Sequence, residues 1–149
     1  MTQECNIAEI QLKHKPSPIT DTIRGSKDIY NLLISKVYDA DTIGYNESFK
    51  LLLLDNANQI IGYRTISEGG LSRMMVDIRM IFQVALIANA TLIIISHNHP
   101  SGNKRPSGED DTLTKQIQDA CKIMFIRLLD HIIVTPENGY YSYCDAGRS

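Results

Sequence analysis

The sequence predicts an α/β fold with a single mixed β-sheet that contains a central hairpin and is flanked by about three helices. Two observations carry this prediction. Segments with helical periodicity alternate along the chain with short runs rich in β-branched residues. Two adjacent β-rich runs, residues 47–54 and 59–67, are separated by the sequence Asp-Asn-Ala-Asn, which is typical of a hairpin turn. The 149 residues contain no linker-like stretch, so we expect one domain over residues 1–149.

Residues 1–18 are expected to form a leading strand and loop. Apolar and polar residues alternate loosely over residues 6–15, which favours a short strand there. Two prolines then end the strand, because proline cannot donate a hydrogen bond to a β ladder. His14 lies in this predicted strand, and we interpret it as a structural residue.

Three helices are predicted from apolar residues that recur every three or four positions. Ser26 is expected to cap the first, Asp77 the second and Ser107 the third. Ser and Asp suit these positions because their side chains accept hydrogen bonds from the free N–H groups of a first helical turn. The apolar face of the third helix is expected to comprise Leu113, Ile117, Cys121, Met124 and Leu128.

The remaining strands follow from short runs of β-branched and aromatic residues. Residues 91–96 are apolar almost throughout, which predicts a strand buried on both faces. Two shorter strands, 131–135 and 140–143, are joined by a Pro-Glu-Asn-Gly turn. We interpret His131 in the first of these as structural. The tyrosines of the second either pack on an edge strand or line a peptide groove.

Composition argues against several functional classes. The net charge of −2 and the absence of a Lys/Arg run give no support to a nucleic-acid partner. No apolar run approaches the roughly 20 residues of a membrane span, so no membrane partner is expected. The first ten residues do not resemble a signal peptide, and three scattered cysteines without a CxxC pair predict reduced thiols. We therefore expect a soluble, cytoplasmic protein.

One segment, residues 96–111, contains several side chains that can bind a metal ion or take part in catalysis. His97 and His99 are two positions apart at the end of a predicted strand, where alternate side chains point to one face about 7 Å apart. Two such imidazoles can bind one metal ion, and Asp110 or Asp111 on the next helix can supply a third ligand. Three protein ligands leave one tetrahedral position for water, which is typical of catalytic zinc. Nitrogen and oxygen donors also suit other divalent transition metals.

The same residues have ordinary structural interpretations. The two histidines can be unrelated core or surface residues. Ser107 and Asp110 match a capping box. An acidic first turn, here Glu109, Asp110 and Asp111, favours the positive end of any helix dipole. On the residues alone, a metal site and a capped helix start both stay open.

The string HNHPSG followed by PSGED closely resembles the signature of the JAB/MPN (JAMM) metalloprotease-like domain, and within it the bacterial RadC branch. In that signature ten residues separate the second His from an Asp. Here ten residues separate His99 from Asp110, which selects Asp110 over Asp111. The similarity covers nearly the whole chain, from residue 19 onward. It implies the cytidine-deaminase-like JAB architecture, with one zinc ion bound by His97, His99 and Asp110.

The resemblance also implies two catalytic roles. Glu47 matches the upstream Glu that acts as general acid and base, and Ser107 matches the serine that stabilises a developing oxyanion. From the residues alone, Glu68 and Glu109 compete equally for the role of the base. The implied activity is zinc-dependent hydrolysis of peptide or isopeptide bonds, so a peptide or protein substrate is the expected partner.

The RadC resemblance implies a second function as well. RadC proteins are named DNA repair proteins, so the alternative is a non-catalytic, metal-supported module in DNA repair or mobile-element biology. We expect this chain to lack the N-terminal helix-hairpin-helix region of longer RadC proteins, so DNA contacts of that region do not transfer. At the second helix, residues 76–79 read Val-Asp-Ile-Arg where relatives have Val-His-Pro-Arg. The His and Pro of that pattern have no counterpart here.

Overall fold

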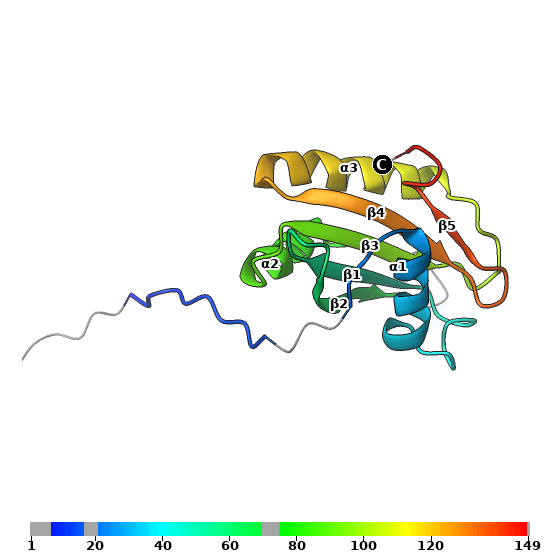
Figure 1. The fold of residues 1–149 in the computed structure, drawn as a ribbon, viewed down its shortest axis with the longest axis horizontal. Coiled ribbons are helices and arrows are strands. Elements are labelled where there is room, and N and C mark those ends of the chain that lie inside the picture. The colour runs from blue at the N-terminus through cyan, green and yellow to red at the C-terminus, as the bar shows by residue number, and fades with distance from the viewer. Residues whose placement is uncertain (1–6, 17–20, 70–74, 149) are drawn as a thin grey trace, which may run out of the picture.

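The computed structural model describes residues 7–16, 21–69 and 75–148 (Figure 1). In chain order the elements are α1 (Ser26–Leu32), the π-helical turn η1 (Leu33–Val37), β1 (Ser48–Leu54), β2 (Ile60–Glu68), α2 (Ile78–Ile87), β3 (Leu92–Asn98), α3 (Gly108–Met124), β4 (Arg127–Val134) and β5 (Tyr140–Ser142). The strands form one sheet in the order β2-β1-β3-β4-β5. β3 and β4 pair in parallel, and the other neighbouring pairs are antiparallel. The predicted α/β fold with one mixed sheet is confirmed.

Helices cover both faces of the sheet. Phe49 and Leu51 of β1 point to one face, where they share a core with buried residues of α2 and α3. Leu52 and Leu54 point to the other face and pack with residues of α1 and η1. Figure 1 shows α3 lying along β4. Residues 93–95 of β3 are fully buried, as predicted for a strand covered on both sides.

The hairpin and the start of the second helix follow the prediction. β1 and β2 pair around a turn in which Asp55 Oδ1 accepts hydrogen bonds from the N–H groups of Ala57 and Gln59. Asp77 caps α2 by accepting hydrogen bonds from the N–H groups of its first turn. β5 lies at the edge of the sheet, so the edge-strand interpretation is confirmed for Tyr140 and Tyr141, whereas Tyr143 lies in the turn that follows the strand.

The predicted leading strand is wrong for the residues that the structure describes. Residues 7–16 adopt neither helix nor strand. Their apolar side chains are almost fully exposed, with Ile7, Ile10 and Leu12 at 84%, 85% and 83%. A single strand is stable only when it pairs with others and buries one face. The structural role of His14, which is exposed as well, is therefore wrong too.

The cap predicted for the first helix is also wrong. Gly25 occupies the N-cap position of α1 and offers no side chain, whereas Ser26 is the first helical residue. The hydroxyl of Ser26 instead donates to Asp145 Oδ2 at 2.5 Å and lies 3.0 Å from the hydroxyl of Tyr140. A tertiary contact with the C-terminal segment has replaced the local one.

The third helix ends earlier than its apolar spacing suggested. Phe125 adopts a left-handed conformation, with φ of 55°, and terminates α3 after Met124. Leu128 belongs to β4, yet it packs in the same core as Cys121 of the helix. The helical spacing thus continued by coincidence, because both elements bury apolar side chains in one cluster. α3 is 17 residues long, and no helix in the described part of the chain is both long and apolar enough to cross a membrane.

Candidate metal centre

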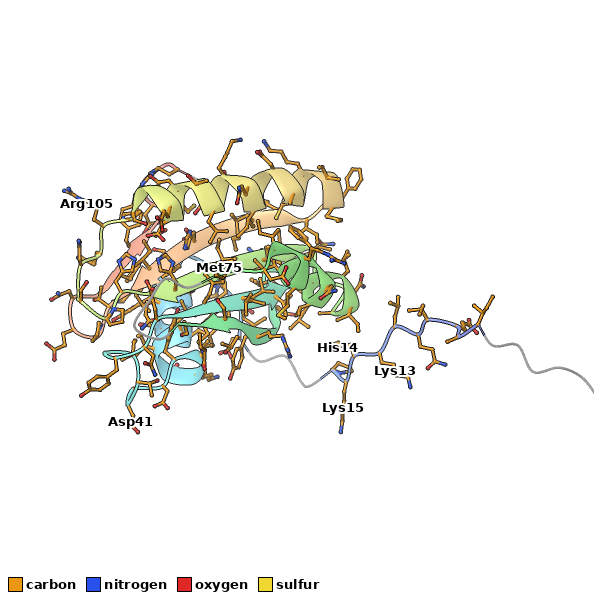
Figure 2. All side chains as sticks on the ribbon, turned by 180° about the vertical axis from the view of Figure 1, so that it is seen from behind. Lys13, His14, Lys15, Asp41, Met75 and Arg105 are labelled. Carbon is orange, nitrogen blue, oxygen red and sulfur yellow. The ribbon has the colours of Figure 1, made fainter. Side chains whose placement is uncertain are left out.

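A cavity of about 600 Å³ opens at the carboxyl end of β3, between the residue before β1 and the start of α3. Its lining contains every residue predicted for the site: Glu47, His97, His99, Ser107 and Asp110. Apolar side chains, including Phe49, Val76 and Met75, complete the walls. Met75 is 83% exposed, and Figure 2 shows Arg105, which precedes α3, pointing outward.

β3 and the loop that follows it position the two histidines. β3 extends to Asn98, beyond the predicted end at Ser96, so His97 lies within the strand and is 2% exposed. His99 follows the strand, and its backbone N–H donates to the carbonyl of Val134 at the end of β4 at 2.9 Å. The two imidazoles face each other, with 2.9 Å between their Nε2 atoms.

Asp110 lies against both imidazoles. Its Oδ1 is 3.3 Å from His97 Nε2, and its Oδ2 is 3.4 Å from His99 Nε2. Donor atoms that share a tetrahedral zinc ion at about 2.0–2.1 Å lie about 3.3 Å from one another. The observed separations are close to that spacing. The structure thus brings the three predicted ligands together, and metal binding by them stays a prediction.

Glu47 faces the same point. Its carboxylate and the ring nitrogens of His97 and His99 offer donor atoms that all lie within 4.8 Å of one another, and the three residues form a group able to hold a metal ion. Of the two competitors for the base, Glu109 lines the same cavity. Glu68 lines a different cavity, so the structure separates it from the histidines.

Asn98 holds the start of β1 beside β3. Its Oδ1 accepts a hydrogen bond from the backbone N–H of Ser48 at 2.8 Å. Its Nδ2 donates to the carbonyls of Ile43 and Asn46, each at 2.8 Å. These bonds fix the backbone next to Glu47. Sequence reasoning missed Asn98, because its full burial, which requires partners for the amide, is visible only in the structure.

Each imidazole also has a partner on its other nitrogen. The Nδ1–H of His99 donates to the carbonyl of Asn103 at 2.6 Å, because a carbonyl can only accept. Nδ1 of His97 lies 2.9 Å from Nε2 of His131. Nδ1 of His131 lies in turn 2.6 Å from the hydroxyl of Thr114. Histidines that bind metals usually have a partner of this kind, which fixes the orientation of the ring.

His131 has a closer relation to the site than the sequence suggested. It lies inside β4, fully buried, and is paired with Ile95, two residues before His97 on the parallel neighbour β3. Its side chain reaches His97 directly. The available signal was a histidine within the otherwise largely apolar run LLDHIIV, because a buried polar group needs a partner.

The pKa values of the cluster follow from these contacts. Burial alone would raise the pKa of Asp110, but hydrogen-bond contacts with His97 and His99 lower it well below its usual range. The contact with Asp110 raises the pKa of His99 against the opposing effect of burial. Burial lowers the pKa of His131 well below its usual value, so this ring is neutral near physiological pH. The cluster therefore favours positive charge between the two Nε2 atoms.

Ser107 and Asp110 form the predicted capping box. The backbone N–H of Ser107 donates to Asp110 Oδ2 at 2.9 Å, and the N–H of Asp110 donates to Ser107 Oγ at 3.1 Å. This role is compatible with metal binding, because an ionised carboxylate can accept at several positions on its two oxygens. Asp111 points elsewhere and accepts a hydrogen bond from the hydroxyl of Tyr143 at 2.7 Å.

The loop between His99 and α3 turns back toward the site at Gly102. This residue has φ of 87°, and a Cβ atom there would lie 2.8 Å from Nδ2 of Asn138. The same Nδ2 donates to the carbonyl of Gly102 at 2.9 Å. The positive φ and this close approach both favour glycine at the turn between His99 and α3.

The donor set of imidazole nitrogens and carboxylate oxygens fits a divalent transition metal. Fold and site together define an α/β domain with a candidate metal centre at the carboxyl end of a central strand. A family model described as the RadC-like JAB domain matches residues 23–148. The chain belongs to the RadC-like JAB domain family.

Curated relatives carry the name UPF0758 protein. One from Flavobacterium johnsoniae is 38% identical over 125 residues, which are 84% of this chain and 52% of the relative. One from Caldanaerobacter subterraneus subsp. tengcongensis is 36% identical over 129 residues, 82% of this chain and 54% of the relative. One from Streptococcus gordonii is 46% identical over 97 residues, 65% of this chain and 42% of the relative. The chain spans about half the length of these relatives.

Proposed function

We propose that this domain is a zinc-dependent hydrolase of peptide or isopeptide bonds. One observation carries the proposal: the Nε2 atoms of His97 and His99 and the carboxylate of Asp110 converge in an open cavity, with Glu47 beside them. A structural zinc site is closed by four protein ligands. A site with three ligands, an open position and a second carboxylate nearby is typical of a catalytic metal.

His97, His99 and Asp110 would hold the ion, and other divalent transition metals suit the same donors. A zinc ion at this position would supply two effects, a lowered pKa for a water molecule, to about 7, and polarisation of the substrate carbonyl. The sequence and the donor set both favour zinc, because they offer nitrogen and oxygen atoms in a three-ligand arrangement.

Glu47 would accept a proton from the attacking water and deliver it to the leaving amine. General acid–base catalysis of this kind contributes about 10²–10⁴-fold to the rate. The position of Glu47 supports this role. Its own carbonyl accepts a hydrogen bond from the N–H of Gly69 at 2.7 Å, and the next residue, Ser48, is held by Asn98. The backbone that carries the carboxylate is thus fixed on both sides.

Ser107 would donate a hydrogen bond to the oxyanion that develops on the substrate. Its Oγ accepts the N–H of Asp110 in the capping box, and that bond leaves the hydroxyl hydrogen unused. Ser107 is exposed and lines the cavity, so a substrate can reach it. A donor of this type, placed before the reaction begins, stabilises charge where it appears.

The cavity supports a peptide or protein substrate. Its volume of about 600 Å³ falls within the usual range for ligand sites, about 300–1,000 Å³. Phe49, Val76 and Met75 would provide apolar contacts beside the polar centre. We also propose a cytoplasmic location, because Cys121 and Cys144 are free thiols and suit a reducing compartment.

The test joins metal analysis to a peptidase screen. Purified protein is assayed for bound metal and for cleavage of a diverse peptide library and of isopeptide-linked substrates. His97→Ala should lose both metal and activity. Glu47→Gln should keep the metal and lose activity by about 10²-fold or more. Glu68→Gln, which changes a carboxylate that lines another cavity, is the control and should change neither.

The outcomes separate the two functions. If Glu109→Gln abolishes activity and Glu47→Gln does not, the base is misassigned. If the protein binds metal through His97 but cleaves no substrate, the non-catalytic module in DNA repair or mobile-element biology is favoured. If the protein binds no divalent metal, both proposals fail.

A further inference from the structure

A column of three buried side chains connects the metal site to the interior of the domain. His97 is 2% exposed, His131 0% and Thr114 2%. His97 Nδ1 lies 2.9 Å from His131 Nε2, and His131 Nδ1 lies 2.6 Å from Thr114 Oγ1. The hydroxyl of Thr114 donates in turn to the carbonyl of Asp110 at 2.6 Å. Every hydrogen in the column therefore has a defined place.

The direction of each bond follows from the last acceptor. A backbone carbonyl can only accept, so the single hydroxyl hydrogen of Thr114 points to Asp110. The Thr114 oxygen is then free to accept from Nδ1–H of His131. A neutral His131 with its hydrogen on Nδ1 carries a lone pair on Nε2, and this lone pair can accept only from Nδ1–H of His97. Nε2 of His97 is thereby the nitrogen that faces His99 and Asp110, and it offers a lone pair there whenever the ring is neutral.

We propose that Thr114 and His131 are positioning residues that fix the tautomer of His97, so that its Nε2 is always the nitrogen offered to a metal ion. This inference rests on the proposed metal site. It extends the site by two residues that touch neither the ion nor a substrate. His99 needs no chain of positioning residues, because the carbonyl of Asn103 sets its tautomer directly.

The first turn of α3 contacts the two histidines of the site and also the Thr114 hydroxyl that positions His131. Asp110 presents its carboxylate to the imidazoles, while its backbone carbonyl anchors the Thr114 hydroxyl one turn later. Aromatic contacts hold the ring of His131 in place. The ring of Tyr143 stacks on it at 4.7 Å between centroids, with 5° between the planes. The orientation of His131 is thus set by packing and its tautomer by Thr114.

Loss of the Thr114 hydroxyl should reverse the direction of the hydrogen bond between His131 and His97. In Thr114→Val, Nδ1–H of His131 loses the acceptor that it has in the structure while the ring stays fully buried, which favours the other tautomer. A hydrogen on Nε2 of His131 would donate to Nδ1 of His97 and transfer the His97 hydrogen to Nε2. That nitrogen could no longer offer a lone pair. Partners that orient metal-binding histidines in this way are typically worth about 10–100-fold in metal affinity.

The experiment uses the full chain and zinc alone. Zinc affinity is measured by competition with a chelator for wild type, Thr114→Val and Thr114→Ser, and long-range ¹H–¹⁵N spectra of the imidazoles report each tautomer. We expect Thr114→Val to bind zinc about 10–100-fold more weakly and to show the Nε2–H form of His97. Thr114→Ser, which keeps the hydroxyl, should restore the affinity and the Nδ1–H form.

Thr112→Val is the matched control. The hydroxyl of Thr112 donates to the carbonyl of Gly108, four residues earlier, at 3.0 Å, as that of Thr114 does to Asp110. Thr112 lines the same cavity, but its hydroxyl donates to this carbonyl and not to a histidine. The affinity of the Thr112→Val variant for zinc should equal that of wild type. If wild type binds zinc and the Kd of Thr114→Val lies within twofold of the wild-type Kd, the proposed positioning role of Thr114 and His131 is refuted. The metal site itself is not.

The spectra of wild type provide a second test that needs no variant. They should show hydrogen on Nδ1 of both His97 and His131. Hydrogen on Nε2 of His131 would refute the inference even if Thr114→Val fails to fold. If wild type binds no zinc at all, the metal site itself fails, and that result is distinct from failure of the proposed positioning role.

Discussion

The side-chain oxygen of Asn98 accepts the backbone N–H of Ser48 at 2.8 Å, and through this bond the end of β3 holds the start of β1. Both residues are neighbours of candidate site residues in the sequence. Asn98 lies between the two histidines, and Ser48 follows Glu47. The backbone that carries Glu47 is therefore held beside the two histidines by a buried amide as well as by the strand pairing.

Replacing Asn98 should destabilise the domain and disturb the site together. Asn98→Ala leaves the N–H of Ser48 and the carbonyls of Ile43 and Asn46 without their partner, and each buried, unpaired group costs about 1–3 kcal/mol. We expect a loss of several kcal/mol in the free energy of unfolding, measured with urea. A change below about 0.5 kcal/mol would show that the amide does not hold β1 in place.

Ser107 should show two separable roles. Ser107→Ala removes the N-cap of α3 and should cost about 1 kcal/mol, whereas Ser107→Gly should cost only a few tenths. Both changes remove the proposed oxyanion donor, so both should lower kcat by about 10²–10³-fold. Parallel urea unfolding and steady-state kinetics provide the check. If activity follows stability, with Gly near wild type, Ser107 is a helix cap alone.

Asp130 should give the domain a pH dependence of its own. Burial raises the pKa of this carboxyl despite hydrogen bonds from Ser142 and from the backbone of Cys144 and His131. A pKa higher in the folded state means that the associated stability is present below the unfolded value of 3.8 and is lost as the pH rises through the folded value.

The comparison with Asp130→Asn isolates this effect. The amide oxygen can still accept from the two backbone N–H groups, and the amide nitrogen can donate to Ser142. The stability of wild type relative to Asp130→Asn should therefore fall as the pH rises above the unfolded pKa of 3.8 and through the higher folded pKa. Urea unfolding across this range measures the difference. A difference that rises with pH would mean that the carboxylate is stabilised, and not penalised, by its surroundings.

Zinc should stabilise the folded domain by mass action. At a free zinc concentration about 100 times the Kd, the gain is about 2.7 kcal/mol, which corresponds to roughly 5–10 °C in Tm for a domain of this size. The shift should disappear in His99→Ala. It should persist in Asp119→Asn, which changes an exposed carboxylate further along α3. An equal shift in His99→Ala and wild type would place the zinc elsewhere.

Local features of the fold could be predicted from the sequence. The capping box at Ser107 and Asp110, the cap at Asp77 and the Asp-Asn-Ala-Asn turn depend on neighbouring residues only. Their outcome therefore followed from side-chain chemistry. The HxH pair and its spacing to Asp110 were visible for the same reason, and the structure places these side chains together.

Features that depend on distant contacts could not be predicted in this way. The hydroxyl of Ser26 does not cap the first helix but contacts Asp145 and Tyr140, more than 100 positions away in the sequence. His131 meets His97 only because β3 and β4 pair in parallel in one particular register, and α3 separates these strands in the sequence. Glu47 was equivalent to Glu68 and Glu109 on the residues alone, since nothing local shows that Asn98 holds its backbone beside the histidines.

Anomalous diffraction at the zinc edge, on crystals grown with zinc, would locate the ion relative to His97, His99 and Asp110. We expect one peak about 2.0–2.1 Å from Nε2 of His97, Nε2 of His99 and a carboxylate oxygen of Asp110. Zinc bound by other residues, or no peak beside His97 and His99, would contradict the proposed metal site.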